Sequence, residues 1–210
     1  PKAESYVTDL VPARDPALGA VEDAAHAHHI PMVGPLEGQA LYVFARMVKA
    51  KTVLEVGSAT GYSAIWLARA ARERGGTLIG IELDPTRHAE AERNLAAAGL
   101  SDAARIIQGD AFDVLPTLDG AFDLVFVDLV RQVGEEAGLR RLFDLCAARV
   151  AVGGLLLFDN VLHGGEAVTL STVGGRAADA LNRLIAGDPR FATTFLTIRD
   201  GVALALRVGS

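Results

Sequence analysis

The sequence contains almost no sulfur-based side chains: its 210 residues include one cysteine and two methionines. A single cysteine can form neither an intrachain disulfide nor a thiolate metal site, so the fold has to be stabilised by its core. Cys146 lies in an apolar run with helical spacing, at residues 142–147. We therefore expect Cys146 to be a small buried core residue.

Long apolar runs and an excess of positive charge are also absent. No apolar run reaches the ~20 residues that a membrane-spanning helix needs, and the first residues have no signal-peptide core. The formal net charge is −6, whereas a protein that binds a phosphate backbone usually has a basic surface. We expect a cytoplasmic protein without a membrane partner, and nucleic acid is disfavoured as a partner.

Short β-type runs alternate with helical runs through the middle of the chain. Strands are predicted at residues 52–56, 78–83, 104–108, 122–127 and 155–158, and helices at residues 63–74, 85–98 and 139–149. After a helix at residues 176–186, β-rich runs at 191–198 and 202–208 flank a hairpin turn at Asp200-Gly201. This order predicts a single α/β domain over residues 1–210, with a doubly wound, mostly parallel seven-stranded sheet that ends in an antiparallel pair.

The loop after the first strand carries the first functional signal. It reads Glu55-Val56-Gly57-Ser58-Ala59-Thr60-Gly61. Its two glycines let the backbone approach a ligand, and ligands of open α/β sheets bind beyond the carboxyl ends of the strands. The spacing differs from G-x-G-x-x-G, and Glu55 would repel a pyrophosphate. A cationic, zwitterionic ligand such as S-adenosylmethionine fits better.

The next two strand ends add acidic groups in register with this loop. Glu82 ends the second strand, where a carboxylate can accept hydrogen bonds from both ribose hydroxyls, a feature shared with NAD-binding folds. Asp110-Ala111 ends the third strand and is placed to flank an adenine. Each residue alone could be a turn or capping residue, but three such strand ends in register favour a cofactor site.

Strands four and five end in oxygen-bearing side chains at the same edge. Asp128 follows the fourth strand, and Asp159-Asn160 ends the fifth. Oxygen ligands suit Mg²⁺, Mn²⁺ or Ca²⁺. The alternative is that Asp128 caps a turn and Asp159-Asn160 begins a loop, so the residues alone leave metal binding open.

The chain resembles the cation-dependent O-methyltransferases, the group that contains catechol and caffeoyl-CoA O-methyltransferase. The resemblance runs from about residue 32 to 206 and is carried by Glu37-Gly38-Gln39, Leu54-Glu55-Val56-Gly57, Thr60-Gly61-Tyr62-Ser63, Gly109-Asp110-Ala111, residues 122–128, Asp159-Asn160-Val161-Leu162 with Gly165, Asn182, Asp188-Pro189-Arg190 and Asp200-Gly201. It implies an S-adenosylmethionine-dependent methyltransferase that uses a divalent cation, with Mg²⁺ favoured, and acts on a catechol-like or other vicinal-dihydroxy small molecule.

The resemblance also implies residue roles. The implied metal ligands are Asp128, Asp159 and Asn160. The implied cofactor contacts are Val33, Glu55, Gly57, Ser58, Ser63, Glu82, Ala111 and Asp128. The N-terminal part, residues 1–50, with predicted helices at 16–28 and 35–49, is implied to form a lid or a dimer face of a homodimer.

One position departs from the family pattern. The family has a lysine shortly after the fourth strand, taken to help deprotonate the acceptor hydroxyl, and this chain has Arg131. A guanidinium stays protonated at any working pH, so Arg131 can orient an anionic acceptor or stabilise an oxyanion but cannot act as a base. Deprotonation of the acceptor hydroxyl then depends on the cation near Asp128, which lowers the pKa of a bound hydroxyl, or on a base other than residue 131. His163 is a candidate base, with an exposed loop histidine as the alternative.

The sequence is also compatible with other functions. Some bacterial members of the group methylate a hydroxylated uridine in tRNA, which a basic stripe beside the site would favour. An NAD-dependent oxidoreductase and a non-catalytic binding protein are alternatives from other classes. Residues 129–137 and 163–175 are predicted loops that contact the acceptor, and His26, His28 and His29 are predicted to lie on the surface.

Overall fold

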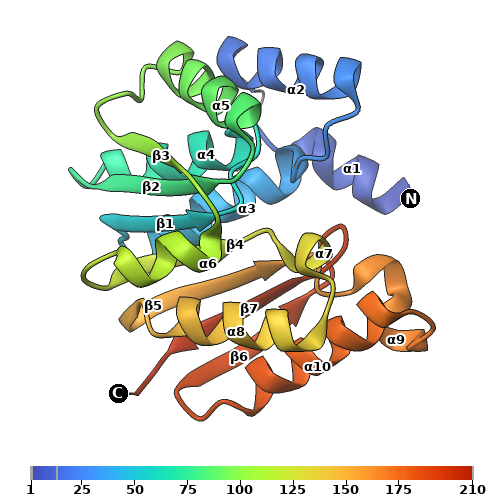
Figure 1. The fold of residues 1–210 in the computed structure, drawn as a ribbon. Helices are drawn as coiled ribbons and strands as arrows, with labels where there is room; N and C mark the ends of the chain where they lie inside the picture. The colour runs from blue at the N-terminus through green and yellow to red at the C-terminus, as the bar shows by residue number, and fades with distance from the viewer. Residues whose placement is uncertain (1, 13, 210) are drawn as a thin grey trace.

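A seven-stranded sheet forms the centre of the molecule in the computed structural model, which describes residues 2–12 and 14–209 (Figure 1). The strands are β1 (Thr52–Val56), β2 (Thr77–Glu82), β3 (Ala104–Gln108), β4 (Phe122–Val127), β5 (Val150–Asp159), β6 (Phe191–Leu196) and β7 (Val202–Arg207). Their order is β3-β2-β1-β4-β5-β7-β6. The first five strands pair in parallel, and β7 is antiparallel to both β5 and β6, which confirms the predicted sheet.

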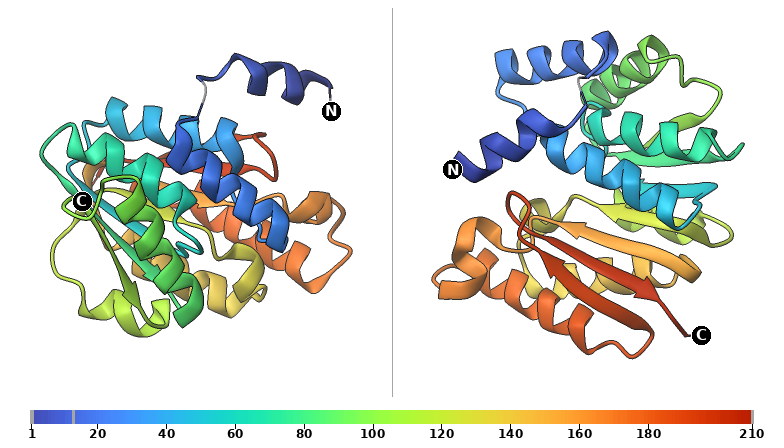
Figure 2. Two further views of the ribbon diagram at one scale, coloured as in Figure 1. Left: turned by 90° about the horizontal axis from the view of Figure 1, so that it is seen from above. Right: turned by 180° about the vertical axis from the view of Figure 1, so that it is seen from behind.

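Helices cover both faces of this sheet (Figures 1 and 2). They are α1 (Lys2–Leu10), α2 (Pro16–His28), α3 (Gly34–Met47), α4 (Tyr62–Arg72), α5 (Pro85–Ala97), α6 (Ala111–Val114), α7 (Val130–Val133), α8 (Glu136–Ala147), α9 (Glu166–Thr169) and α10 (Val173–Gly187), with 3-10 turns at Leu115–Thr117 and His163–Gly165. Alternate strand residues point to opposite faces, so Phe126 packs with α3 and α4 whereas Val125 packs with α8 and α10. Cys146 of α8 is fully buried, as predicted.

Several predicted boundaries were wrong. The predicted strand at 155–158 begins five residues earlier, at Val150, and the preceding helix ends at Ala147. The reason is a shift in the β4–β5 register between Phe122 and Leu124, which lets the strand continue through Gly153-Gly154 instead of turning there. The predicted loops at 129–137 and 163–175 contain α7, α9 and the first turns of α8 and α10.

The N-terminal helices are tied to the cofactor-loop side of the sheet. In α2, Glu22 accepts a hydrogen bond of 2.6 Å from the Tyr62 hydroxyl, at the start of α4, and a second bond from Arg14. Helix α1, which the sequence did not predict, projects beyond the layer of α2 to α5 (Figure 2). A lid or dimer role for residues 1–50 stays a prediction.

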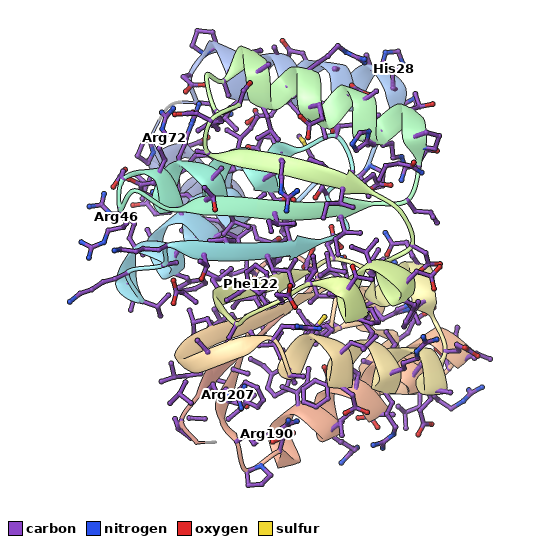
Figure 3. The ribbon with its side chains drawn as sticks, turned by 60° about the vertical axis from the view of Figure 1, so that its left-hand side comes forward. His28, Arg46, Arg72, Phe122, Arg190 and Arg207 are labelled. Carbon is purple, nitrogen blue, oxygen red and sulfur yellow. The ribbon has the colours of Figure 1, made fainter. Side chains whose placement is uncertain are left out.

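The histidines near the N-terminus match the sequence-based expectation. His26, His28 and His29 are exposed, and Figure 3 shows His28 at one end of α2. Among the described helices, none has the length and apolar character required to cross a membrane. The cytoplasmic location stays a prediction.

The turn between α4 and β2 generates a stability prediction. A Cβ atom built on Gly76 would overlap the backbone of Lys51, whereas one built on Gly19 in α2 meets no atom within 4 Å. We expect Gly76→Ala to lower the free energy of unfolding by about 1–3 kcal/mol, because the Lys51 backbone cannot move without disturbing β1. Gly19→Ala, the control, should raise it by about 0.5–1 kcal/mol through helix propensity. Urea denaturation measures both, and equal effects would contradict the packing argument.

Candidate active site

A cavity of about 1150 Å³ opens at the carboxyl ends of the parallel strands. Four of the residues predicted to contact the cofactor line it: Gly57, Glu82, Ala111 and Asp128. Met32, Ala59 and Phe112 line it as well and were not predicted. The cavity lies at the edge where doubly wound sheets bind their ligands.

The loop after β1 is shaped by contacts with the neighbouring strands. Gly57 has φ +95°, and a Cβ atom there would lie 2.7 Å from the carbonyl oxygen of Asp128. Only glycine fits such a conformation and such an approach. The amides of Gly57 and Ser58 both donate to the carbonyl of Ile81, at 3.0 and 3.1 Å. The loop is therefore fixed to β2 and β4, with its backbone facing the cavity.

Glu82 and Asp110 present carboxylates to the same cavity. Both oxygens of Glu82 accept backbone bonds, from the Ala59 amide at 2.8 Å and the Asp84 amide at 2.9 Å. Asp110 caps α6 by accepting a bond of 2.8 Å from the Phe112 amide. These bonds hold the carboxylates at the strand ends, and their remaining lone pairs can accept ribose or adenine donors.

The other predicted cofactor residues lie behind the cavity wall. Val33, Glu55, Ser58 and Ser63 are buried and do not line the cavity. Both carboxylate oxygens of Glu55 and the Ser58 hydroxyl lack hydrogen-bond partners among the described residues. Burial raises the pKa of Glu55 to about 7, and the hydroxyls of Ser58 and Ser63 oppose this shift. Direct contact between these residues and a cofactor stays a prediction.

The three predicted metal ligands do come together at the ends of β4 and β5. The Asn160 amide nitrogen donates to Asp128 Oδ1 at 2.7 Å and to Asp159 Oδ2 at 2.9 Å. Among the described residues, no three His, Cys, Asp or Glu side chains form a metal-binding group. A metal role for Asp128, Asp159 and Asn160 stays a prediction.

The carboxyl groups of this cluster have too few positive charges nearby to compensate them when they ionise. Burial raises the pKa of Asp128 to about 7, helped by the charges of Asp159 and Glu55. Burial also raises the pKa of Asp159, against the opposing effects of the Asn160 amide and of Arg199. A buried carboxylate with a raised pKa is one whose negative charge is poorly compensated.

Two residues of the cluster were missed by the sequence analysis. Glu37, in the first turn of α3, is 1% exposed, and its Oε1 atom is buried without a hydrogen-bond partner among the described residues. Burial, followed by the charge of Asp159, raises the pKa of Glu37 to about 9. Arg199 reaches Glu37 Oε2 at 3.4 Å from the turn before β7. The sequence did contain a signal for Glu37, the tripeptide Glu37-Gly38-Gln39, but the sequence analysis used it only as part of the family resemblance and assigned it no role in the site.

Arg131 lies beside the cluster, but His163 does not line the cavity. Arg131 Nε donates to Asp200 at 3.1 Å and to the Asn160 side-chain oxygen at 3.3 Å. His163 Nδ1 is paired with Glu166 at 2.9 Å, and the histidine side chain is 15% exposed. The structure therefore places His163 neither in the cavity as the candidate base nor in solvent as a free loop histidine.

Comparison with known proteins identifies the family. The family model described as O-methyltransferase matches residues 19–208. This chain belongs to the O-methyltransferase family. The chain is 31% identical to a catechol O-methyltransferase of Niastella koreensis, over 97% of this chain and 95% of that protein. It is 36% identical to a catechol O-methyltransferase of Mycobacterium tuberculosis, over 79% and 74%.

Solved structures agree with this assignment. An O-methyltransferase of Streptomyces achromogenes in complex with S-adenosylmethionine has a TM-score of 0.85 at 28% identity, covering 99% of this chain and 96% of that one. One from Bacillus cereus, in complex with S-adenosylhomocysteine, has a TM-score of 0.86 at 26% identity, covering 98% and 97%. The protein is thus an S-adenosylmethionine-dependent O-methyltransferase, which sets aside the oxidoreductase and non-catalytic alternatives.

The raised pKa values predict how stability depends on pH in EDTA. The folded state retains protons that the unfolded state releases near its ordinary carboxyl pKa. The contribution of these groups to stability is therefore fully present at low pH and is lost as pH rises through about 7 and 9. Glu37→Gln cannot lose this proton. We expect the free energy of unfolding of the variant, relative to wild type, to rise by roughly 3–4 kcal/mol between pH 6 and 9.

Chemical denaturation at a series of pH values measures this difference. Glu136→Gln, at an exposed position of α8, is the matched control and should follow the wild-type pH dependence. A Glu37→Gln protein with the wild-type slope would show that Glu37 is ionised in the folded state.

Proposed function

We propose that this enzyme methylates a hydroxyl of a catechol-like or other vicinal-dihydroxy small molecule and uses a divalent cation, Mg²⁺ in the first place. The observation that carries the proposal is the double position of Asp128. This residue lines the cavity beside the cofactor loop, and it also accepts a hydrogen bond from Asn160 within the oxygen cluster. A methyl donor and a hydroxyl held at the cluster would be neighbours.

The residues of the cluster fit a divalent cation. Carboxylate and amide oxygens are the ligands that Mg²⁺ takes in proteins. The raised pKa values of Asp128 and Asp159 indicate that their negative charge, when they ionise, lacks a counterion. The Oε1 atom of Glu37 is a further buried oxygen without a hydrogen-bond partner among the described residues. Asn160 presents its amide nitrogen to both carboxylates, so holding a cation requires this amide to turn its oxygen towards them.

Each side chain then has a defined task. Asp128, Asp159 and Asn160 would hold the cation, which when bound supplies positive charge that lowers the pKa of an acceptor hydroxyl. Gly57, Glu82 and Ala111 would hold S-adenosylmethionine, with the buried Val33, Glu55, Ser58 and Ser63 shaping the wall behind it. Arg131 would orient an anionic acceptor, because a guanidinium cannot remove a proton.

Methyl transfer itself needs little more from the protein than placement. The acceptor hydroxyl would lose its proton to water in the cavity, and its oxygen would then take the methyl group of the bound sulfonium. A carbon–oxygen bond would form as the carbon–sulfur bond breaks, with the electron pair staying on sulfur. Holding the two reactants side by side converts a bimolecular reaction into a unimolecular one. A cation held by Asp128 and Asp159 would favour the ionised acceptor over the neutral one.

Removal of the cation or of one ligand tests this proposal. We expect EDTA to abolish methylation of catechols and Mg²⁺ to restore it. Asp159→Ala should lower kcat/KM by about 100-fold or more, since the positioned charge is lost. Binding of S-adenosylhomocysteine, measured by calorimetry, should change by less than about threefold in this variant.

Asp102→Ala is the matched control, because Asp102 is 77% exposed and lies before the amino end of β3, whereas the site lies at the carboxyl ends of the strands. It should retain wild-type activity. Activity that survives both EDTA and Asp159→Ala would overturn the cation role. Methylation of tRNA in place of any catechol would overturn the proposed acceptor class.

A further inference from the structure

Two arginines flank the oxygen cluster on the acceptor side of the cavity. Arg131 comes from α7, and Arg199 comes from the turn between β6 and β7. Both line the cavity together with Asp159 and Asn160. Their side chains are 47% and 36% exposed, so each guanidinium lies partly open to whatever enters.

The guanidinium of Arg131 is fixed along one edge and free along the other. Its Nε and Nη2 atoms donate to Asp200, and Nε also donates to Asn160. Asp200 is held in turn by a bond of 2.6 Å from the Gly164 amide. Nη1 has no hydrogen-bond partner within the described part of the chain. This arrangement orients an unused pair of N–H donors.

Arg199, which lines the cavity, has an unfavourable backbone conformation. Its φ is +48°, in the left-handed region that a long side chain rarely adopts. Its one side-chain hydrogen bond among the described residues is the long contact of 3.4 Å with Glu37. Strain of this kind persists where the surrounding structure imposes it, and it is concentrated at functional sites.

Arg131 and Arg199 both bring guanidinium donors into the cavity, although each also contacts a carboxylate, Asp200 and Glu37 respectively. Guanidinium groups with free donors bind carboxylates through charge-assisted, often bidentate, hydrogen bonds. A chain with a net charge of −6 repels an anionic acceptor in general, so such an acceptor needs guanidinium donors at the site itself. We propose that Arg131 and Arg199 recognise a carboxylate carried by the acceptor, which makes the substrate class vicinal-dihydroxy aromatic acids. This inference rests on the proposed function.

Matched acceptors that differ in one charge test the inference. The probes are 3,4-dihydroxybenzoate and its methyl ester, compared in the wild-type holoenzyme with S-adenosylmethionine and Mg²⁺. We expect kcat/KM for the acid to exceed that for the ester by about tenfold or more, the contribution expected of charge-assisted bonds. Arg131→Gln and Arg199→Gln should each reduce this acid-to-ester ratio by about tenfold, and Arg131→Lys should restore part of it.

Arg183→Gln is the matched control, because Arg183 is 77% exposed and pairs with Asp179 outside the cavity. It should leave the ratio unchanged. Calorimetric binding of both probes to the complex with S-adenosylhomocysteine and Mg²⁺ gives a second readout that does not need turnover. A preference for binding the acid that depends on the two arginines supports the inference even if neither probe is methylated, an outcome that would count against the proposed function alone.

Three results would overturn the inference. The first is equal use and equal binding of acid and ester by the wild type. The second is a ratio that stays constant in both arginine variants. The third is a gain of Mg²⁺ affinity in Arg199→Gln with no change in the ratio, which would mean that Arg199 only balances the charge of the acidic cluster.

Discussion

The site depends on the hydrogen bonds from the Asn160 amide to Asp128 and Asp159. Because β4 and β5 are parallel with Val127 opposite Phe158, the next residue of each strand is a carboxylate, and the two meet at one edge. Two buried carboxylates repel each other unless a donor lies between them. The amide supplies that donor at 2.7 and 2.9 Å, and so joins the cofactor side of the sheet to the acceptor side.

This concentration of buried acid explains the other charged groups nearby. Glu37 adds a third carboxyl group from α3, whose pKa of about 9 means that it enters the site largely as a neutral acid at pH 7. Arg199 approaches from the opposite side and lowers the pKa of Asp128, Asp159 and Glu37. Protonation of Glu37 and the guanidinium of Arg199 therefore reduce the cost of burying these carboxyl groups. The remaining negative charge can be balanced by a further cation.

The sequence predicted the features that follow from strand order and missed those that depend on distant contacts. Parallel strands end at one edge, so Glu82, Asp128 and Asp159 could be placed together from their positions after apolar runs. Glu37 lies 122 residues before Asp159 in the numbering, and no local pattern links a helix start to that strand end. Helices α7 and α9 each have four residues, too few for a helical period to be visible.

On the acceptor side of the site, hydrogen bonds join two backbone segments and fix their shape. The amides of Val161 and Leu162 donate to the carbonyls of Gly201 and Asp200, so the segment after β5 is fastened to the β6–β7 turn. Asn160 and Arg199, one in each segment, both have positive φ. A change of loop shape here would displace Asn160 from Asp128 and Asp159. Selection for a new acceptor would therefore act on side chains such as Arg131 and Arg199, which can be exchanged without moving the backbone that holds the cluster.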